Sequence, residues 1–148
     1  AKLGLIGGRR TVLSGVYRRA FAERGMSIEQ RIAQPLSGLI EDGDVSSPRL
    51  CEEAKRILSP IKNCTHILLA CTHYPAINGL LKEFVSEKTT LIDPGLELVR
   101  RVGKVKSTAS GKDIFLTSGD PESMKKAALR AFGVLIKEVD RVTLNRKS

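Results

Sequence analysis

The sequence predicts an α/β fold with a mainly parallel sheet and flanking helices. Short apolar runs, typical of buried strands, alternate with helical segments of about ten to fifteen residues. Gly, Pro, Ser or Asp marks most of the junctions between them. The chain has 148 residues, of which 41% are hydrophobic, so it is large enough to bury a core of its own.

Apolar runs and capping signals predict the elements in order. We expect strands at 2–7, 26–33, 65–70, 89–93 and 113–120, and a further extended piece at 134–144. The run at 65–70 is continuous, as in the middle of a parallel sheet. Helices are expected at 11–25 (capped by Thr11), 48–58 (after Ser47), 75–84 (opened by Pro75), 95–102, and from Pro121 after Asp120. Residues 35–44 form a loop or a short helix, and 103–112 form a basic loop.

Composition excludes several classes of protein. No apolar run approaches the ~20 residues that a membrane span needs. Three cysteines do not suit a disulfide framework, which favours a reducing, cytoplasmic location. Twenty-five Lys and Arg against 16 Asp and Glu give a net charge of +9. That charge fits a solvated surface, a nucleic-acid site or a funnel for a dianionic substrate. The absence of Trp and of nucleic-acid motifs argues against nucleic acid.

Ligands of open parallel sheets bind beyond the carboxyl ends of the strands. Three turns are expected there, at 7–11, 71–75 and 117–120, and the second has the most reactive composition. Cys71 follows a strand and precedes a predicted helix, whose positive dipole end favours a thiolate. His73 lies two residues on and could exchange protons with it. The alternative is an inert packing cysteine, since free cysteines are often buried.

A second Cys-x-His pair, Cys64 and His66, suggests zinc, but geometry argues against it. Seven strand residues span about 23 Å, whereas zinc ligands lie within ~2.3 Å of the ion. We therefore expect no metal, and interpret Cys64, His66 and Cys51 as structural. The Gly7-Gly8 turn lacks the spacing of a phosphate loop and is interpreted as a tight turn.

The segment Leu-Ala-Cys-Thr-His-Tyr-Pro (69–75) resembles the second cysteine motif of the glutamate racemases, in the aspartate/glutamate racemase family. Supporting similarities follow in the family's order, from about residue 3 to residue 133. They are 7–11 with Ser14 and Tyr17, 33–36, 39–41, 92–95 and 115–120.

The resemblance implies a flavodoxin-like lobe that inverts the α-carbon of an acidic amino acid, glutamate before aspartate, without a cofactor. Two cysteines would act from opposite faces, one as thiolate base and one as thiol acid. Cys71 matches one of them. His73 and Glu41 match the auxiliary acid and carboxylate, with Asp42 one residue away as the alternative. Thr72 and His73 match substrate contacts, and Thr11 is a further candidate.

The departures from the family concern the other half of the site. The first cysteine motif and an Asp-Ser motif are missing, and Gly8 replaces a Thr. We expect a lobe at 1–93 and a segment at 94–148 that in the family returns to the other lobe, so this chain carries half of the site. The second thiol would come from the missing lobe or from a homodimer partner. Apolar residues at Leu96, Val99, Val102, Leu129 and Phe132 would favour such pairing if exposed. A silent binding module and a nucleic-acid-binding domain remain the alternatives.

Overall fold

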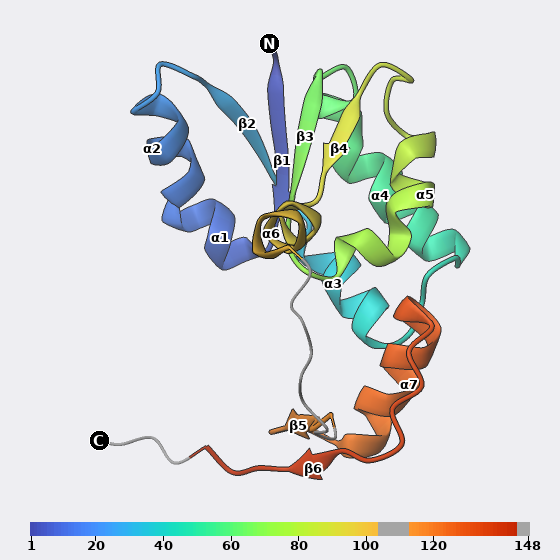
Figure 1. Ribbon diagram of the computed structural model, residues 1–148. Helices are drawn as coiled ribbons and strands as arrows, with labels where there is room; N and C mark the ends of the chain where they lie inside the picture. The colour runs from blue at the N-terminus through green and yellow to red at the C-terminus, as the bar shows by residue number, and fades with distance from the viewer. Residues whose placement is uncertain (104–112, 145–148) are drawn as a thin grey trace.

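A four-stranded, fully parallel sheet forms the centre of the protein (Figure 1). The computed structural model describes residues 1–103 and 113–144. The strand order is β2-β1-β3-β4, with bounds Leu3–Gly7 for β1, Ile28–Ile32 for β2, His66–Ala70 for β3 and Thr90–Ile92 for β4. The carboxyl ends of these strands therefore meet at one edge, as the sequence predicted.

Helices cover both faces of the sheet. On one face, α1 (Arg9–Ser14) and α2 (Val16–Ala22) pack on Leu5 and Ile28. On the other face, α3 (Gln34–Glu41), α4 (Pro48–Leu58) and α5 (Asn78–Glu83) enclose the larger core around Ile6, Ile67 and Leu69. The short 3-10 helix η1 (Ser59–Ile61) follows α4. The helix α6 (Pro94–Val102) lies across the carboxyl edge of the sheet (Figure 1).

The central strand and the helix α4 match the predictions closely. β3 pairs with β1 on one side and β4 on the other. Ile67 and Leu69 are buried, whereas Leu68, on the opposite face, is half-buried. Ser47 caps α4 by accepting a hydrogen bond from the Leu50 amide, and Pro48 takes the first helical position.

The helix expected at 11–25 is wrong in two respects. It is two helices, because Gly15 adopts a left-handed conformation (φ 66°) that ends α1. In addition, Thr11 is not the cap, since α1 begins at Arg9 with Gly8 at the N-cap position. The Arg9 amide instead donates to the side-chain oxygen of Gln34, 3.2 Å away. The interpretation of Gly7-Gly8 as a tight turn agrees with this arrangement.

Of two further segments, one takes an alternative that the sequence allowed and the other differs from expectation. Residues 35–44 take the short-helix alternative, as α3. The helix expected to open at Pro75 is a 3-10 turn, η2 (Tyr74–Ile77), followed by α5. The buried Tyr74 and Ile77 hold this tighter turn against the core.

The described residues after α6 form a small unit beside α3. The helix α7 (Pro121–Phe132) is capped by Asp120, as predicted, and packs against α3 and η2. The strands expected at 113–120 and 134–144 shorten to β5 (Leu116–Thr117) and β6 (Asp140–Arg141), which pair in parallel. The basic loop predicted at 103–112 lies outside the described residues except for Gly103.

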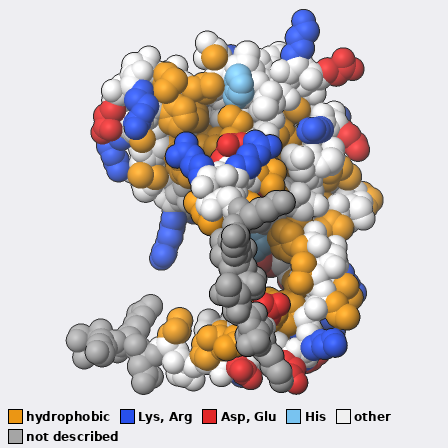
Figure 2. Space-filling model, in the orientation of Figure 1, with side chains coloured by type: hydrophobic (Ala, Val, Ile, Leu, Met, Phe, Trp, Pro, Cys, Tyr) orange, Lys and Arg blue, Asp and Glu red, His pale blue; other side chains and the backbone are white. Residues whose placement is uncertain are grey.

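Exposed apolar side chains gather on α6 and α7. The residues expected to form such a surface (Leu96, Val99, Val102, Leu129 and Phe132) are all at least half exposed. Figure 2 shows hydrophobic side chains along α7. None of the helices described combines the length and apolar character needed to cross a bilayer.

Replacing the α4 cap tests the local basis of this fold. Ser47→Ala removes the acceptor of the Leu50 amide and the donor to the Asp44 carboxylate, and we expect the free energy of unfolding to fall by about 1 kcal/mol or more in urea denaturation. Ser46→Ala is the matched control, because Ser46 is exposed and its bond to Asp44 uses only its backbone amide. Equal losses in the two variants would contradict the capping role.

Candidate active site

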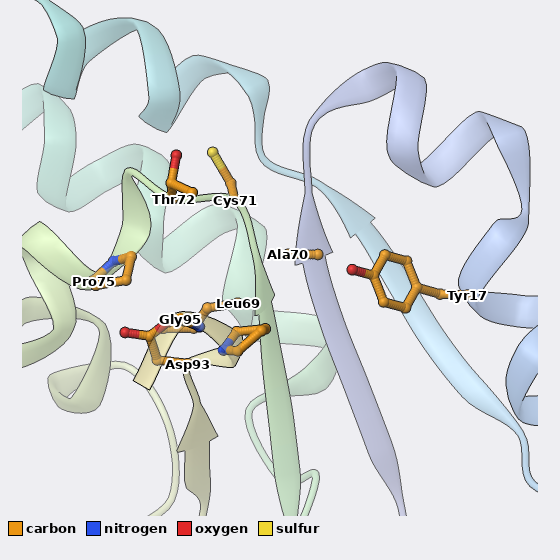
Figure 3. Close-up of a pocket in the computed structure, with 9 residues that line it drawn as sticks. Tyr17, Leu69, Ala70, Cys71, Thr72, Pro75, Asp93 and Gly95 are labelled. Atoms are coloured by element: carbon orange, nitrogen blue, oxygen red, sulfur yellow. Dashed lines mark hydrogen bonds between the residues drawn. The ribbon is translucent and has the colours of Figure 1, made fainter. Parts of the chain in front are cut away.

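Cys71 lies directly after β3, at the carboxyl edge of the sheet. The register pairs Ala70, the last residue of β3, with Gly7, the last residue of β1. Cys71 is one of the residues that line a cavity of about 410 Å³ at this edge (Figure 3). The cavity is lined by Tyr17, Leu69, Ala70, Cys71, Thr72, Pro75, Asp93, Pro94 and Gly95. The turn at 71–75 therefore forms part of a pocket, as its place in the sequence predicted.

A row of three polar side chains runs from this cavity to α3. The Sγ atom of Cys71 lies 3.3 Å from Nδ1 of His73, and Nε2 of His73 lies 3.3 Å from Oε1 of Glu41. A carboxylate at Nε2 favours the tautomer that keeps its proton there, which leaves Nδ1 as an acceptor. The imidazole is thus placed to exchange a proton with the thiol.

The geometry distinguishes Glu41 from its neighbour Asp42. Glu41 ends α3 and reaches His73, whereas Asp42 is the exposed residue that follows the helix. The side chain of Glu41 is itself well exposed, so its contact with His73 is open to solvent. Of these two carboxylates, α3 therefore brings Glu41 to His73, and the sequence had left the existence of that helix open.

Two hydroxyl groups approach Cys71 from the core, and sequence reasoning missed both as site residues. The Ser37 Oγ atom lies 3.5 Å from Cys71 Sγ and donates to the Tyr74 hydroxyl at 3.3 Å. Tyr74 in turn donates to the Ala33 carbonyl at 3.1 Å. Burial and, to a smaller extent, the charge of Cys71 raise the pKa of Tyr74 to about 12, so the phenol stays protonated. The available signal was the four-residue spacing of Ser37 and Glu41, which places both on one helix face.

The interactions that could stabilise a Cys71 thiolate in the structure differ from the helix dipole that the sequence predicted. We expected the dipole of a helix beginning at Pro75, but the four-residue 3-10 turn η2 occupies that position. The macrodipole argument applies to aligned α-helical turns and is weak for so short a segment. Contacts with His73 and Ser37 are the interactions that the structure provides instead.

Of the two predicted threonine contacts, one lines the cavity and the other does not. Thr72 lines the cavity beside Cys71 (Figure 3), but Thr11 is not among the described residues that line it. Tyr17 and Asp93 also line the cavity, although the sequence identified them only as parts of motifs. The Asp93 side chain accepts a hydrogen bond from the Gly95 amide at 2.8 Å and so caps α6.

A second cavity lies on the α7 side of His73. Its volume is about 610 Å³, and His73 and Glu41 form part of its wall. The remaining lining comes from Ile40, the loop before α7, and α7 itself: Thr117, Asp120, Ser123, Met124, Ala127, Ala128, Ala131 and Phe132. His73 and Glu41 therefore stand between the cavity at Cys71 and the space under α7.

The remaining cysteines lie away from this site. Cys64 precedes β3 and Cys71 follows it, so the two Cys-x-His pairs are at opposite edges of the sheet. Cys64 is only 1% exposed, and burial raises the pKa of its thiol. Cys51 is half-buried on α4. No three His, Cys, Asp or Glu side chains within residues 1–103 and 113–144 are grouped as metal ligands would be.

The fold and the site define an α/β chain with a cysteine, a histidine and a carboxylate in a row at the carboxyl edge of a parallel sheet. No family model matches the sequence. Known proteins do match it. A glutamate racemase of Bacillus cereus is 30% identical over 98% of this chain and 58% of its own length. One of Pseudomonas aeruginosa is 33% identical over 84% of this chain and 51% of its own length.

Solved structures agree with the sequence comparison. A glutamate racemase of Bacillus anthracis superposes with a TM-score of 0.79 at 25% identity, covering 97% of this chain and 57% of that one. One from Thermus thermophilus, in complex with beta-chloro-D-alanine, gives a TM-score of 0.73 at 26% identity with the same coverage. The chain is thus similar to glutamate racemases over most of its own length, and it spans somewhat more than half the length of the relatives it matches.

Thiol labelling tests the contrast between the cysteines. We expect iodoacetamide to alkylate Cys71 in the native chain at least about tenfold faster than Cys64, because Cys64 is buried and its raised pKa disfavours the thiolate. Peptide mass mapping of timed samples measures both rates. Equal alkylation rates for the two cysteines in the fully folded chain would show that Cys64 is not enclosed.

Proposed function

We propose that this chain supplies one of the two thiols of a cofactor-independent glutamate racemase. The observation that carries the proposal is the row Cys71–His73–Glu41, which begins at a residue that lines the 410 Å³ cavity, in a chain similar to glutamate racemases. A relative from Francisella tularensis has been solved in complex with D-glutamate, which favours glutamate as the substrate over aspartate. The net charge of +9 suits a substrate with two carboxylates.

The proposed chemistry is a proton transfer at the α-carbon. The Cys71 thiolate removes the α-proton from one face, forming an S–H bond and leaving the electron pair on a planar carbon. A thiol on the opposite face then gives its proton to that carbon, which completes the inversion. For the other enantiomer, the roles of the two thiols are reversed. The chemistry uses protein thiols alone and requires no metal or organic cofactor.

The neighbouring side chains have distinct proposed roles. His73 exchanges the thiol proton through Nδ1, and Glu41 fixes the imidazole through Nε2. Thr72 lines the cavity beside the sulfur, and we propose that it contacts substrate together with His73. Thr11 is retained as a substrate contact only from the resemblance, since the structure does not place it on the cavity wall.

The second thiol of the proposed mechanism must come from a residue other than those described as lining the cavity at Cys71. We propose residues 1–93 as the lobe that carries the second cysteine motif, and residues 94–148 as the segment that packs on the complementary lobe. The exposed apolar residues of α6 and α7 fit such a contact. That lobe, or a second copy of this chain, would present the other thiol, and a monomer limited to Cys71 would not racemise glutamate. The reducing conditions that free thiols need suit the cytoplasm.

Removing the Cys71 thiol is the direct test. In an assembly that contains this chain and racemises glutamate, Cys71→Ala should lower the rate about 10³-fold or more, because one face of the α-carbon loses its base. Cys64→Ala and Cys51→Ala should retain most activity, since both lie away from the cavity. Chiral chromatography of D- and L-glutamate gives the rates. A comparable loss in Cys64→Ala with an intact fold would overturn the assignment.

Glu41 and Asp42 form a matched pair for the role of the carboxylate. Glu41→Gln should lower kcat about tenfold and leave KM nearly unchanged, because the contact is with His73 rather than with substrate. Asp42→Asn carries the same change of charge one residue away and should have little effect. Steady-state kinetics in both directions separate the two constants. Similar small effects at both positions would make Glu41 an ordinary surface carboxylate.

A further inference from the structure

Ser37 has one hydroxyl hydrogen and two acceptors within reach. Its Oγ atom lies 3.3 Å from the Tyr74 hydroxyl and 3.5 Å from Cys71 Sγ. Ser37 is 5% exposed and Tyr74 is fully buried, so water does not compete for these groups. Ser37 is held on α3 between Leu36 and the helix turn that carries Ile40, both of which are buried in the core.

We propose that Ser37 is a positioning residue whose hydroxyl hydrogen moves between Tyr74 and Cys71, and so stabilises the Cys71 thiolate. The inference rests on the proposed role of Cys71 as a proton-transfer thiol. It extends that role by naming a second side chain that contacts the sulfur. Ser37 reaches the sulfur from α3, whereas His73 reaches it from the loop that follows β3.

With Cys71 in its thiol form, every donor in this group has an acceptor. Cys71 S–H can donate to Ser37 Oγ, Ser37 donates to the Tyr74 hydroxyl, and Tyr74 donates to the Ala33 carbonyl. The three bonds run in one direction and end on a backbone oxygen, which keeps this neutral state satisfied inside the core.

With Cys71 as thiolate, the sulfur has no proton to give and only accepts. The Ser37 hydrogen then rotates to the sulfur, while Tyr74 keeps its bond to Ala33. A hydrogen bond to a charged acceptor is stronger than one between neutral groups. Only the acceptor side of the Tyr74 oxygen loses a partner, so the rearrangement leaves no buried donor unpaired.

Other titratable groups also face Cys71. His73 contacts the sulfur from its own loop, with Glu41 of α3 behind it. Asp93, before α6, and Tyr17, on α2, line the same cavity. Tyr74 remains neutral, since its pKa is raised to about 12. The experiment below changes only Tyr74 among these groups, by the loss of its hydroxyl oxygen, and leaves the others as they are.

The test is the pH dependence of Cys71 alkylation in the isolated chain, measured with iodoacetamide and peptide mass mapping. Ser37→Ala removes the donor to the thiolate, so the midpoint of the profile should rise by about one pH unit. Tyr74→Phe removes the competing acceptor and should lower the midpoint. In the double variant, the midpoint should stay above that of the native chain, because the hydroxyl that donates to the sulfur is still missing.

Both substitutions delete one oxygen atom, and circular dichroism checks that each variant is folded. Cys51, on α4, is the internal reference, and its profile should not change. A midpoint unchanged in Ser37→Ala, or raised by Tyr74→Phe, would overturn the proposal. Alkylation needs no substrate, so these results stand apart from racemisation: a chain that shows the shifts but never contributes to racemisation contradicts the proposed function and not the role of Ser37.

Discussion

The site depends on the parallel pairing of β3 with both of its neighbours. β3 is matched residue by residue with β1 from His66 to Ala70, and with β4 at its beginning. A slip of one residue would turn Ile67 and Leu69 out of the larger core and put Leu68 in their place. Core packing therefore fixes the register, and the register fixes Cys71 as the first residue beyond the carboxyl edge. The apolar contacts of β3 therefore determine where the Cys71 thiol lies.

Tyr74 connects that core to the polar side chains around the sulfur. Its ring is fully buried, while its hydroxyl group reaches the Ala33 carbonyl at the start of α3. The same side chain thus holds the turn that carries Cys71 and His73 against the helix that carries Ser37 and Glu41. A buried phenol with a satisfied hydroxyl stabilises the structure through its area and restricts the geometry through its hydrogen bonds. The hydrogen-bonding groups on both sides of the sulfur are consequently part of one packed unit.

Local signals predicted what local interactions determine. The β3 strand, the start of α4 after Ser47 and the Asp120 cap depend on a few adjacent residues, and each was confirmed. The break at Gly15, the η2 turn in place of a helix at Pro75, and the helical state of residues 34–41 depend on contacts with distant segments. Ser37 could not be identified for that reason: it becomes a neighbour of Cys71 only once α3 is a helix and Tyr74 is buried beside it. The same helical phase separates Glu41 from Asp42, which adjacent positions in a sequence do not distinguish.

The distribution of thiols in the structure bears on how this half of a site would work. Among the described residues that line the cavity, Cys71 is the only cysteine, while Cys64 is enclosed at the opposite edge of the sheet and Cys51 lies on α4. The proposed inversion needs a base on one face of the α-carbon and an acid on the other, so a second thiol would have to reach the cavity from outside the described residues that line it. Pro94 and Gly95, at the start of α6, line this cavity, and the apolar side chains further along that helix are exposed. Among the described residues, the exposed apolar side chains of α6 therefore lie on the helix whose first turn lines the cavity, which fits the proposal that a second lobe or a second copy completes the site.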